Sequence, residues 1–568
     1  MRDWPKSCRV IAPLLAVVAL GCEGSVAGDP DGAGAKGSGG SMNLGGGATL
    51  PPGTDATALL PARIRRLTDA EYQASVSVLV GDGAKDVSAD FVPDSRQSGF
   101  TVNEAQRVDP VFARQLAGAA ELLAKDVRSH AAERAPCADP VGGAEACATT
   151  FIRSFGEQTY RRPLAEDEVA QLLTVFRTAF EGGSYEEGIE LVVRAMLQSA
   201  GFLYLTEIGD APAANVKLTP YELASSVSYL IQGRPPTAAL LEVARSGGLD
   251  TPEGRSAALL DPSLGLFGLD AKTRVVQVVR EWLGIDRINE TAKDSNVYGH
   301  YTDEVKSAMG REAGEFLQVL VSQHGGSLSQ LLSANWTVAN APLAKIYDSN
   351  ATITGTDFQE LSTPTRLGML NQGAFLAVFA HAHESAPVLR GVAVMRRVAC
   401  SPVGDPVGLT TAVVPPPPDA TKTTRERFSV HGTGTGCAVC HERIDNFGFA
   451  FEQFDGMGEA RVAGMDNGHA VDSSVNVIGT DFDGPYADSN ALVTAMAQSP
   501  QVRECFARHV FRALSGTSAD ELRASEDDFV KHWSSTALTS AGGKTDTDLV
   551  GTLSSYITSP GFAFRRAQ

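Results

Sequence analysis

Apolar residues recur with the period of an α-helix along most of the chain. Runs of this kind predict helices at Glu166–Phe180, Tyr185–Leu197, Thr273–Leu283 and Thr302–Val321. In the third run the apolar side chains form one stripe, which is typical of a helix that packs on a core. Regular alternation of apolar and polar residues, the mark of half-buried strands, is scarce before residue 400. We therefore expect a mainly α fold.

Two helix starts carry the same local signal. Thr68 is followed three residues later by Glu71, and Thr219 is followed in the same way by Glu222. In such a capping box each side chain accepts a hydrogen bond from the backbone N–H of the other residue, so donors at the helix start are satisfied. We expect one helix to begin directly after each threonine.

Loop-forming segments divide the helical pattern into blocks. At roughly 100–200 residues per domain, a chain of 568 residues corresponds to about three to five domains. Gly-, Pro- and Thr-rich stretches mark the joints, the last of them being the four-proline spacer Pro415–Pro418. The expected blocks are four helical domains at 61–135, 148–209, 216–350 and 470–568, and a different domain at 364–463.

The first 60 residues predict export and a membrane anchor. Basic residues precede the apolar core Val10–Leu20, which is too short to span a membrane and is typical of a secretory signal over residues 1–21. The signal ends in a motif that resembles a bacterial lipoprotein cleavage site, with Cys22 as the lipidated residue; plain secretion is the alternative. Residues 22–60 form a Gly-rich linker. We expect the protein to be held by lipid on the periplasmic or cell-surface face of a bacterial membrane.

Composition removes several classes of function. The chain has 48 Lys and Arg against 67 Asp and Glu, a net charge of −19, so we expect no nucleic-acid partner. The 43% of hydrophobic residues is enough for sizeable cores. No later segment approaches 18 uninterrupted apolar residues, which excludes a polytopic membrane protein. Membrane contact is therefore expected only through the lipid anchor.

The cysteines of the exported part group by context. Cys137 and Cys147 bracket a short Gly- and Pro-containing loop, and we predict a disulfide there, since an oxidising compartment favours one. Cys400 and Cys505 are left over, and spacing alone allows either a second disulfide or two buried thiols. Of these alternatives, the Cys400–Cys505 disulfide is our prediction.

The segment with the clearest chemistry is Cys437-Ala438-Val439-Cys440-His441. Cys-x-x-Cys-His in an exported protein is the attachment signature of c-type haem. Two thiols at this spacing reach the two vinyl groups of one porphyrin, and the adjacent imidazole becomes the proximal iron ligand. A zinc site would need a second ligand pair, and a redox-active Cys-x-x-Cys would follow a strand rather than a glycine-rich loop. We predict one covalently attached haem c, held by Cys437 and Cys440, with His441 as its proximal iron ligand.

The sixth iron ligand decides what such a haem does, because an electron carrier fills both axial positions. Met457 and Met465 follow the motif and are the two candidates, with an open position as the third alternative. For Met457 the alternative is that it fills a gap in the core, as most methionines do. The run His381-Ala382-His383-Glu384 has metal-ligand residue types, but without partner ligands we expect a structural or solvated role for it.

The segment Cys437–Arg461 resembles the haem segment of the planctomycete-type multidomain cytochrome c proteins. These are large exported proteins built from a fixed series of domains of unknown function. Further motifs that match the series are Arg65-Arg66-Leu67, Tyr160-Arg161-Arg162-Pro163-Leu164, Trp282-Leu283-Gly284 and Ser385–Gly391. The resemblance implies a multidomain helical body with a small c-type haem domain at 364–463, and the family has no settled activity.

The function we expect is extracytoplasmic electron transfer through one covalent haem, with an unidentified redox partner protein. A haem-dependent oxidative enzyme, peroxidase- or oxygenase-like, is the second hypothesis, because the body that precedes the haem is large for a simple carrier. A non-enzymatic surface binding protein with a structural haem is the third. No catalytic residue is assigned.

Overall fold

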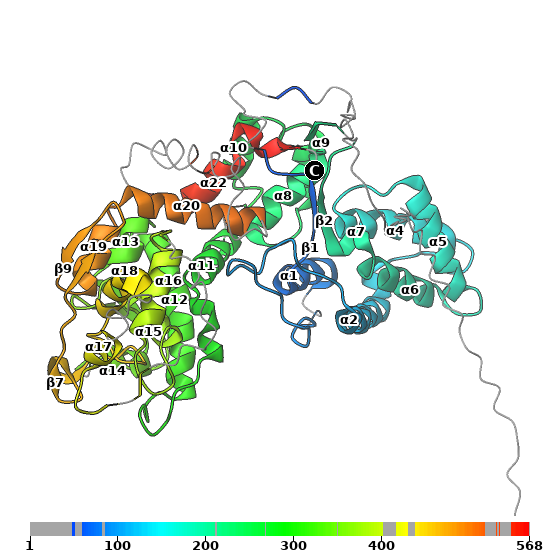
Figure 1. Ribbon diagram of the computed structural model, residues 1–568. Coiled ribbons are helices and arrows are strands. Elements are labelled where there is room, and N and C mark those ends of the chain that lie inside the picture. The colour runs from blue at the N-terminus through cyan, green and yellow to red at the C-terminus, as the bar shows by residue number, and fades with distance from the viewer. Residues whose placement is uncertain are drawn as a thin grey trace, which may run out of the picture. The chain divides into compact units, whose positions relative to one another are not determined.

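Helices dominate the computed structural model of the chain, and its strands are short (Figure 1), which confirms the mainly α class. The structure describes residues 48–50, 59–81, 84, 86–210, 213–266, 269–348, 350–401, 416–417, 419–429, 438–516, 530, 533 and 547–566. The predicted signal over 1–21, the lipidation candidate Cys22, most of the linker 22–60 and Cys437 lie outside these residues. Among the helices described, none is both long and apolar enough to cross a membrane.

The first half of the chain has a hydrophobic core of its own, formed by residues between Tyr72 and Leu203. Its helices are α1 (Asp69–Val80), α2 (Pro110–Ser129), α3 (Ala131–Arg134), α4 (Ala144–Tyr160), α5 (Glu166–Phe180), α6 (Tyr185–Leu197) and α7 (Ala200–Leu203). Both α5 and α6 have the predicted bounds. The capping box of α1 is confirmed, because Thr68 N donates to the Glu71 carboxylate at 3.0 Å and Glu71 N donates to Thr68 Oγ1 at 3.2 Å.

A second, larger core joins the remaining helices. They are α8 (Pro220–Gln232), α9 (Ala238–Arg245), α10 (Pro252–Leu260), α11 (Leu269–Leu283), α12 (Asp303–Gln323), α13 (Leu328–Ser333), α14 (Ala341–Tyr347), α15 (Gly373–Val378), α16 (Pro387–Arg397), α17 (Thr424–Phe428), α18 (Ala438–Phe449), α19 (Ser489–Met496), α20 (Pro500–Ser515) and α22 (Leu549–Ile557). The capping box of Thr219 and Glu222 at the start of α8 is also confirmed.

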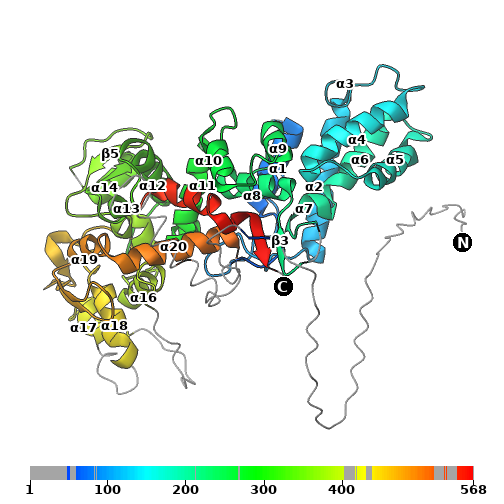
Figure 2. The same ribbon diagram turned by 90° about the horizontal axis from the view of Figure 1, so that it is seen from above.

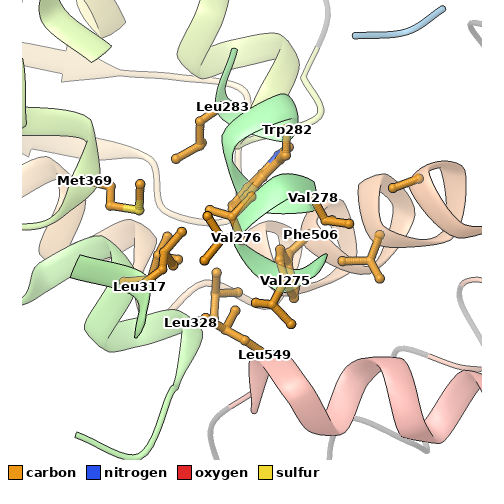
Figure 3. Close-up of a cluster of buried hydrophobic side chains, with 14 of the residues drawn as sticks. Val275, Val276, Val278, Trp282, Leu283, Leu317, Leu328, Met369, Phe506 and Leu549 are labelled. Carbon is orange, nitrogen blue, oxygen red and sulfur yellow. The ribbon is translucent and has the colours of Figure 1, made fainter. Parts of the chain in front are cut away.

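The apolar stripe of α11 lies at the centre of this second core. Figure 3 shows Val275, Val276 and Trp282 of α11 gathered with Phe506 of α20 and Leu549 of α22. Because these partners come from distant parts of the chain, the stripe ties the C-terminal helices to the middle of the protein. The helix begins at Leu269, four residues before the predicted start.

The strands form five two-stranded antiparallel sheets among the described residues. The pairs are β1 (Arg63–Arg66) with β2 (Tyr204–Glu207), β3 (Asn215–Lys217) with β10 (Phe564–Arg566), β4 (Trp336–Ala339) with β5 (Gln359–Ser362), β6 (Met465–Asp466) with β7 (His469–Ala470), and β8 (Val475–Val477) with β9 (Gly484–Tyr486). Because β10 pairs with β3, the C-terminal strand lies beside residues 215–217, in the middle of the sequence (Figure 2).

A buried ionic cluster connects the C-terminal strand β10 to β1 and β2. Arg63 Nε and Arg565 Nη2 each lie 2.7 Å from the carboxylate of Glu207. Burial by itself raises the pKa of Glu207, but the two guanidinium groups outweigh it and hold the pKa well below its usual range. Since Glu207 ends β2 and Arg565 belongs to β10, the cluster joins two sheets that are far apart in sequence.

Both predicted disulfides are present. Cys137 and Cys147 are bonded with a Cα–Cα distance of 5.5 Å, and Cys400 and Cys505 with a distance of 5.4 Å. The first closes the short loop ahead of α4. The second joins the segment that follows α16 to α20, so the alternative of two buried thiols does not apply.

Candidate haem site

The haem-attachment motif lies at the start of helix α18. The helix begins at Ala438, and Cys440 and His441 belong to its N-terminal end. Cys440 is a free, half-buried thiol that packs against the second core. The glycine-rich loop that precedes the helix and Cys437 itself lie outside the described residues. The described half of the motif therefore places one thiol and the adjacent imidazole at one helix end.

The imidazole of His441 is oriented by a carboxylate on the same helix. His441 Nδ1 lies 2.9 Å from Oδ1 of Asp445, one turn further along α18. A carboxylate only accepts hydrogen bonds, so Nδ1 is the donor. A histidine held in this way ligates a metal through Nε2, with its ring orientation and tautomer fixed by the partner. Asp445 was not singled out from the sequence, although a spacing of four residues in a helix places two side chains on one face.

Helix α18 is positioned by close packing against α16. The two helices lie side by side (Figure 1), and glycines occur at both contacts. A Cβ atom at Gly391 would overlap the carbonyl oxygen of Ile444, and one at Gly448 would overlap that of Pro387. The earlier residue of α16 thus meets the later residue of α18, and the later one meets the earlier, so the two helices pack antiparallel. Glycine is required at both positions because any side chain would push α18 away from α16.

A buried arginine holds the segment that follows α18 through hydrogen bonds. Arg390 of α16 is fully buried and donates to the carbonyl oxygens of Phe451, Phe454 and Asp455, and to that of Leu376. Arg390 thus provides hydrogen-bond donors for backbone carbonyls beyond the end of α18, which have no partner within the helix. Burial lowers the pKa of Arg390.

A network of charged side chains continues from Arg390 to helix α17. Glu452 lies 3.5 Å from Arg390 and 3.2 Å from Arg461, and Arg461 lies 2.8 Å from Asp466. The carboxylate of Asp466 also accepts from the backbone N–H of Thr424, the first residue of α17, at 2.6 Å. Because α17 leads into the attachment loop, the network connects both sides of the haem segment.

Among the described residues, the run from His381 to Glu384 is not part of a converging group of potential metal ligands. It lies in the loop between α15 and α16, where Glu384 pairs with Arg427 of α17, and His383 lies 3.6 Å from Glu384. In the part of the chain that the structure describes, only one group of potential metal ligands converges, namely Cys400, Cys505 and His509. The two sulfurs of that group are joined in the disulfide.

The two distal-ligand candidates occupy different surroundings. Met457 is fully buried in a turn held by Asp455, which accepts from Met457 N at 2.9 Å. Met465 is 40% exposed and lies in β6, in a hairpin whose turn residues Asn467 and Gly468 both have positive φ. The core therefore encloses the thioether of Met457 but not that of Met465.

The phenylalanines that follow the motif are used in packing within the protein. Phe447, Phe449, Phe451 and Phe454 are all buried. Phe447 packs edge-on against Phe482, and the guanidinium of Arg425 lies 4.9 Å from the ring centre of Phe449. These side chains thus contribute to the core that supports α18.

A separate cavity lies in the first half of the chain. Its volume is about 630 Å³, and its lining residues lie between Ile64 and Ser225, so none comes from the haem segment. Arg162 borders the cavity and pairs with Glu168 at 2.8 Å, whereas the neighbouring Arg161 is buried and donates to backbone carbonyls. Sequence reasoning did not find this cavity, because its wall combines β1, β2, α4 and α8.

Comparisons with known proteins identify the family of this chain. Four family models, each described as a protein of unknown function, match in series: PSD3 (DUF1587) at residues 65–129, PSD5 (DUF1595) at 147–207, PSD4 (DUF1592) at 218–348 and PSCyt3 (DUF1588) at 366–463. Together they cover more than half of the chain. No curated protein and no solved structure matches it. The chain therefore belongs to the planctomycete-type multidomain cytochrome c proteins.

Proposed function

We propose that this protein is an exported c-type cytochrome that transfers electrons outside the cytoplasm through one covalent haem. The observation that carries the proposal is the Cys-x-x-Cys-His motif at the start of α18, with the His441 ring oriented by Asp445. Cys437 and Cys440 would hold the porphyrin, and His441 would be the proximal ligand. The PSCyt3 model, which spans the motif, supports a cytochrome-like role by its name.

The residues described fit such a group. Cys440 is not in a disulfide and is half-buried, as a thiol that forms a thioether at a protein-enclosed porphyrin needs to be. His441 donates through Nδ1, so Nε2 is the ring nitrogen that would ligate the iron. The haem, when bound, supplies a one-electron redox couple. The protein contributes the ligands, the support of α16 and the buried network around Arg390, which together hold α18 in place.

The location of the protein belongs to the same proposal. We infer an anchor through lipidated Cys22, followed by the Gly-rich linker, on the periplasmic or cell-surface face of a bacterial membrane. A second protein would then be the redox partner. The acidic composition supports the exclusion of a nucleic-acid partner.

The position of this cavity bears only on whether it could serve the second hypothesis, oxidation of a substrate. An oxidative enzyme needs room for its substrate beside the iron, whereas the cavity of about 630 Å³ is lined by residues from Ile64 to Ser225. No haem-segment residue borders it. The cavity therefore offers the second hypothesis no support.

The experiment is expression of the full chain in a bacterium with a working cytochrome c maturation system. We expect a pyridine haemochrome spectrum and an intact mass that show one haem per chain. The double variant Cys437→Ser, Cys440→Ser should lose the haem. The matched control Cys137→Ser, Cys147→Ser removes two cysteines elsewhere and should keep it. Apo-protein from the unaltered chain, in cells that mature another c-type cytochrome, would contradict the proposal.

A further inference from the structure

His441 and Asp445 form a contact that haem attachment itself does not require. Covalent attachment needs two thiols and an imidazole, whereas Asp445 lies one turn beyond them. The Nδ1–Oδ1 distance is 2.9 Å, and the two side chains are 17% and 9% exposed. Solvent therefore competes little for this hydrogen bond, and the carboxylate faces the ring from within the folded protein.

Helix stability is a poor explanation for this pair. A pair spaced by four residues supports a helix best when the acid lies N-terminal to the base, because that order complements the helix dipole. In α18 the order is reversed, with His441 near the N-terminal end and Asp445 after it. The contact is thus better explained by its effect on the imidazole than by its effect on the helix.

We propose that Asp445 is a positioning residue that holds the His441 ring and gives it partial anionic character, which lowers the reduction potential of the haem. A carboxylate that accepts the Nδ1–H of a ligating histidine makes Nε2 a stronger donor. A stronger donor stabilises ferric iron more than ferrous iron, and hydrogen bonding around the ligands is one of the means by which a protein sets a haem potential. The inference rests on the proposed function, since it needs a haem bound by His441.

The neighbouring residue Glu442 separates this effect from that of charge alone. Glu442 is exposed on the same helix, directly after His441. Removal of its charge changes the electrostatic potential near the site while the hydrogen bond between His441 and Asp445 stays in place. Glu442→Gln is therefore the matched control for Asp445→Asn, which keeps the size and an acceptor oxygen but removes the charge of the acceptor.

The test is a spectroelectrochemical titration of the full-length holoprotein, with ferric EPR as the second measurement. We expect Asp445→Asn to raise the potential by about 59 mV, the equivalent of a tenfold change in a one-electron equilibrium. It should also shift the EPR g values, which report the strength of the imidazole donor. Glu442→Gln should change both measurements clearly less, and Asp445→Glu should restore part of the original potential.

Two results would overturn the inference while the haem is present. One is an unchanged potential in Asp445→Asn, and the other is an equal shift in Asp445→Asn and Glu442→Gln. The haem content of each variant, measured as the pyridine haemochrome, shows that the chain has matured and folded. If the unaltered chain carries no haem, the proposed function and this inference fail together.

Discussion

Tyr347, the last residue of α14, donates its hydroxyl hydrogen bond to Glu312, a fully buried carboxylate on α12. Thr337 of β4 donates to the other oxygen of Glu312 at 2.6 Å. Burial raises the pKa of Glu312 to about 7, although both hydroxyls and the more distant Arg366 act to lower it. One carboxyl group thus links three elements of the second core, and its burial favours the protonated form.

The raised pKa of Glu312 predicts how stability depends on pH. The folded chain keeps the proton up to about pH 7, whereas the unfolded chain releases it near the ordinary value of 4.5. The folded state therefore binds more protons between these values, so the contribution of Glu312 to stability is present below pH 4.5 and is lost as pH rises toward 7. At 1.36 kcal/mol per pKa unit, the loss is about 3 kcal/mol.

Replacement of Glu312 by Gln should remove this dependence. We expect the free energy of unfolding of Glu312→Gln, relative to the unaltered chain, to rise by about 3 kcal/mol from pH 4.5 to pH 7 and then to stay constant. Urea titrations at several pH values measure it. Glu315→Gln, at a partly exposed position on the same helix, should show no such trend. Parallel curves for Glu312→Gln and the unaltered chain would refute the prediction.

The contact between α16 and α18 predicts an intolerant glycine. Gly391→Ala would place a methyl group against the carbonyl oxygen of Ile444, so α18 must shift or the core must deform. We expect a loss of about 1–3 kcal/mol in the free energy of unfolding and a lower yield of haem-bearing protein. Gly118→Ala on α2 is the control, because its Cβ meets nothing within 4 Å. This control should be stabilised by about 0.5–1 kcal/mol. Tolerance of Gly391→Ala in denaturant unfolding would show that the helices separate easily.

Local signals explain why much of the helical fold could be predicted. Helix α6 has its predicted bounds because Ser184 and Glu187 form a capping box before a periodic apolar run. Helix α11 starts four residues earlier than predicted, because the continuous apolar period that marks the helix begins only at Val275. Sequence periodicity therefore locates a helix more reliably than it locates the first turn of that helix.

The site was predictable only where its contacts are local. The attachment motif is contiguous, and Asp445 lies within one helical turn of His441, so both were within reach of sequence reasoning. Arg390 and Glu452 were not, because their burial depends on elements that meet only in the folded chain. A charged residue is normally expected at the surface. The residues next to Arg390 in the sequence do not indicate that it is buried beside Glu452, 62 positions away.

The disulfides differ in the length of chain that they close, which predicts unequal effects on stability. Cys400–Cys505 has a sequence separation of 105 residues, against 10 for Cys137–Cys147. If loop entropy of the unfolded chain dominates, removal of the longer bridge should cost about 2 kcal/mol more. The comparison is between paired Cys→Ser variants of each bridge, measured by guanidinium unfolding of the holoprotein. An equal loss, or a larger one for the short bridge, would argue against the entropic explanation.

The sixth iron ligand is the test that separates an electron carrier from an oxidative enzyme. Met465 is 40% exposed in β6, and the adjacent Asp466 accepts from the first backbone N–H of α17, the helix that leads into the attachment loop. Met457 is fully buried, in a turn whose Gly456 N donates to the Tyr298 hydroxyl at 3.1 Å. We expect Met465 to be the ligand, because its thioether is not enclosed by the core.

Leucine variants separate ligation from packing, because leucine keeps most of the volume of methionine but has no sulfur. Met465→Leu should convert a low-spin spectrum into a high-spin one with little change in stability. Met457→Leu should leave the spectrum unchanged, whereas Met457→Ala should cost about 2–5 kcal/mol by leaving a cavity in the core. A high-spin spectrum in Met457→Leu alone would make Met457 the ligand. If the unaltered protein is already high-spin and binds carbon monoxide readily, its sixth position is open, and the carrier proposal gives way to a haem-dependent oxidative enzyme.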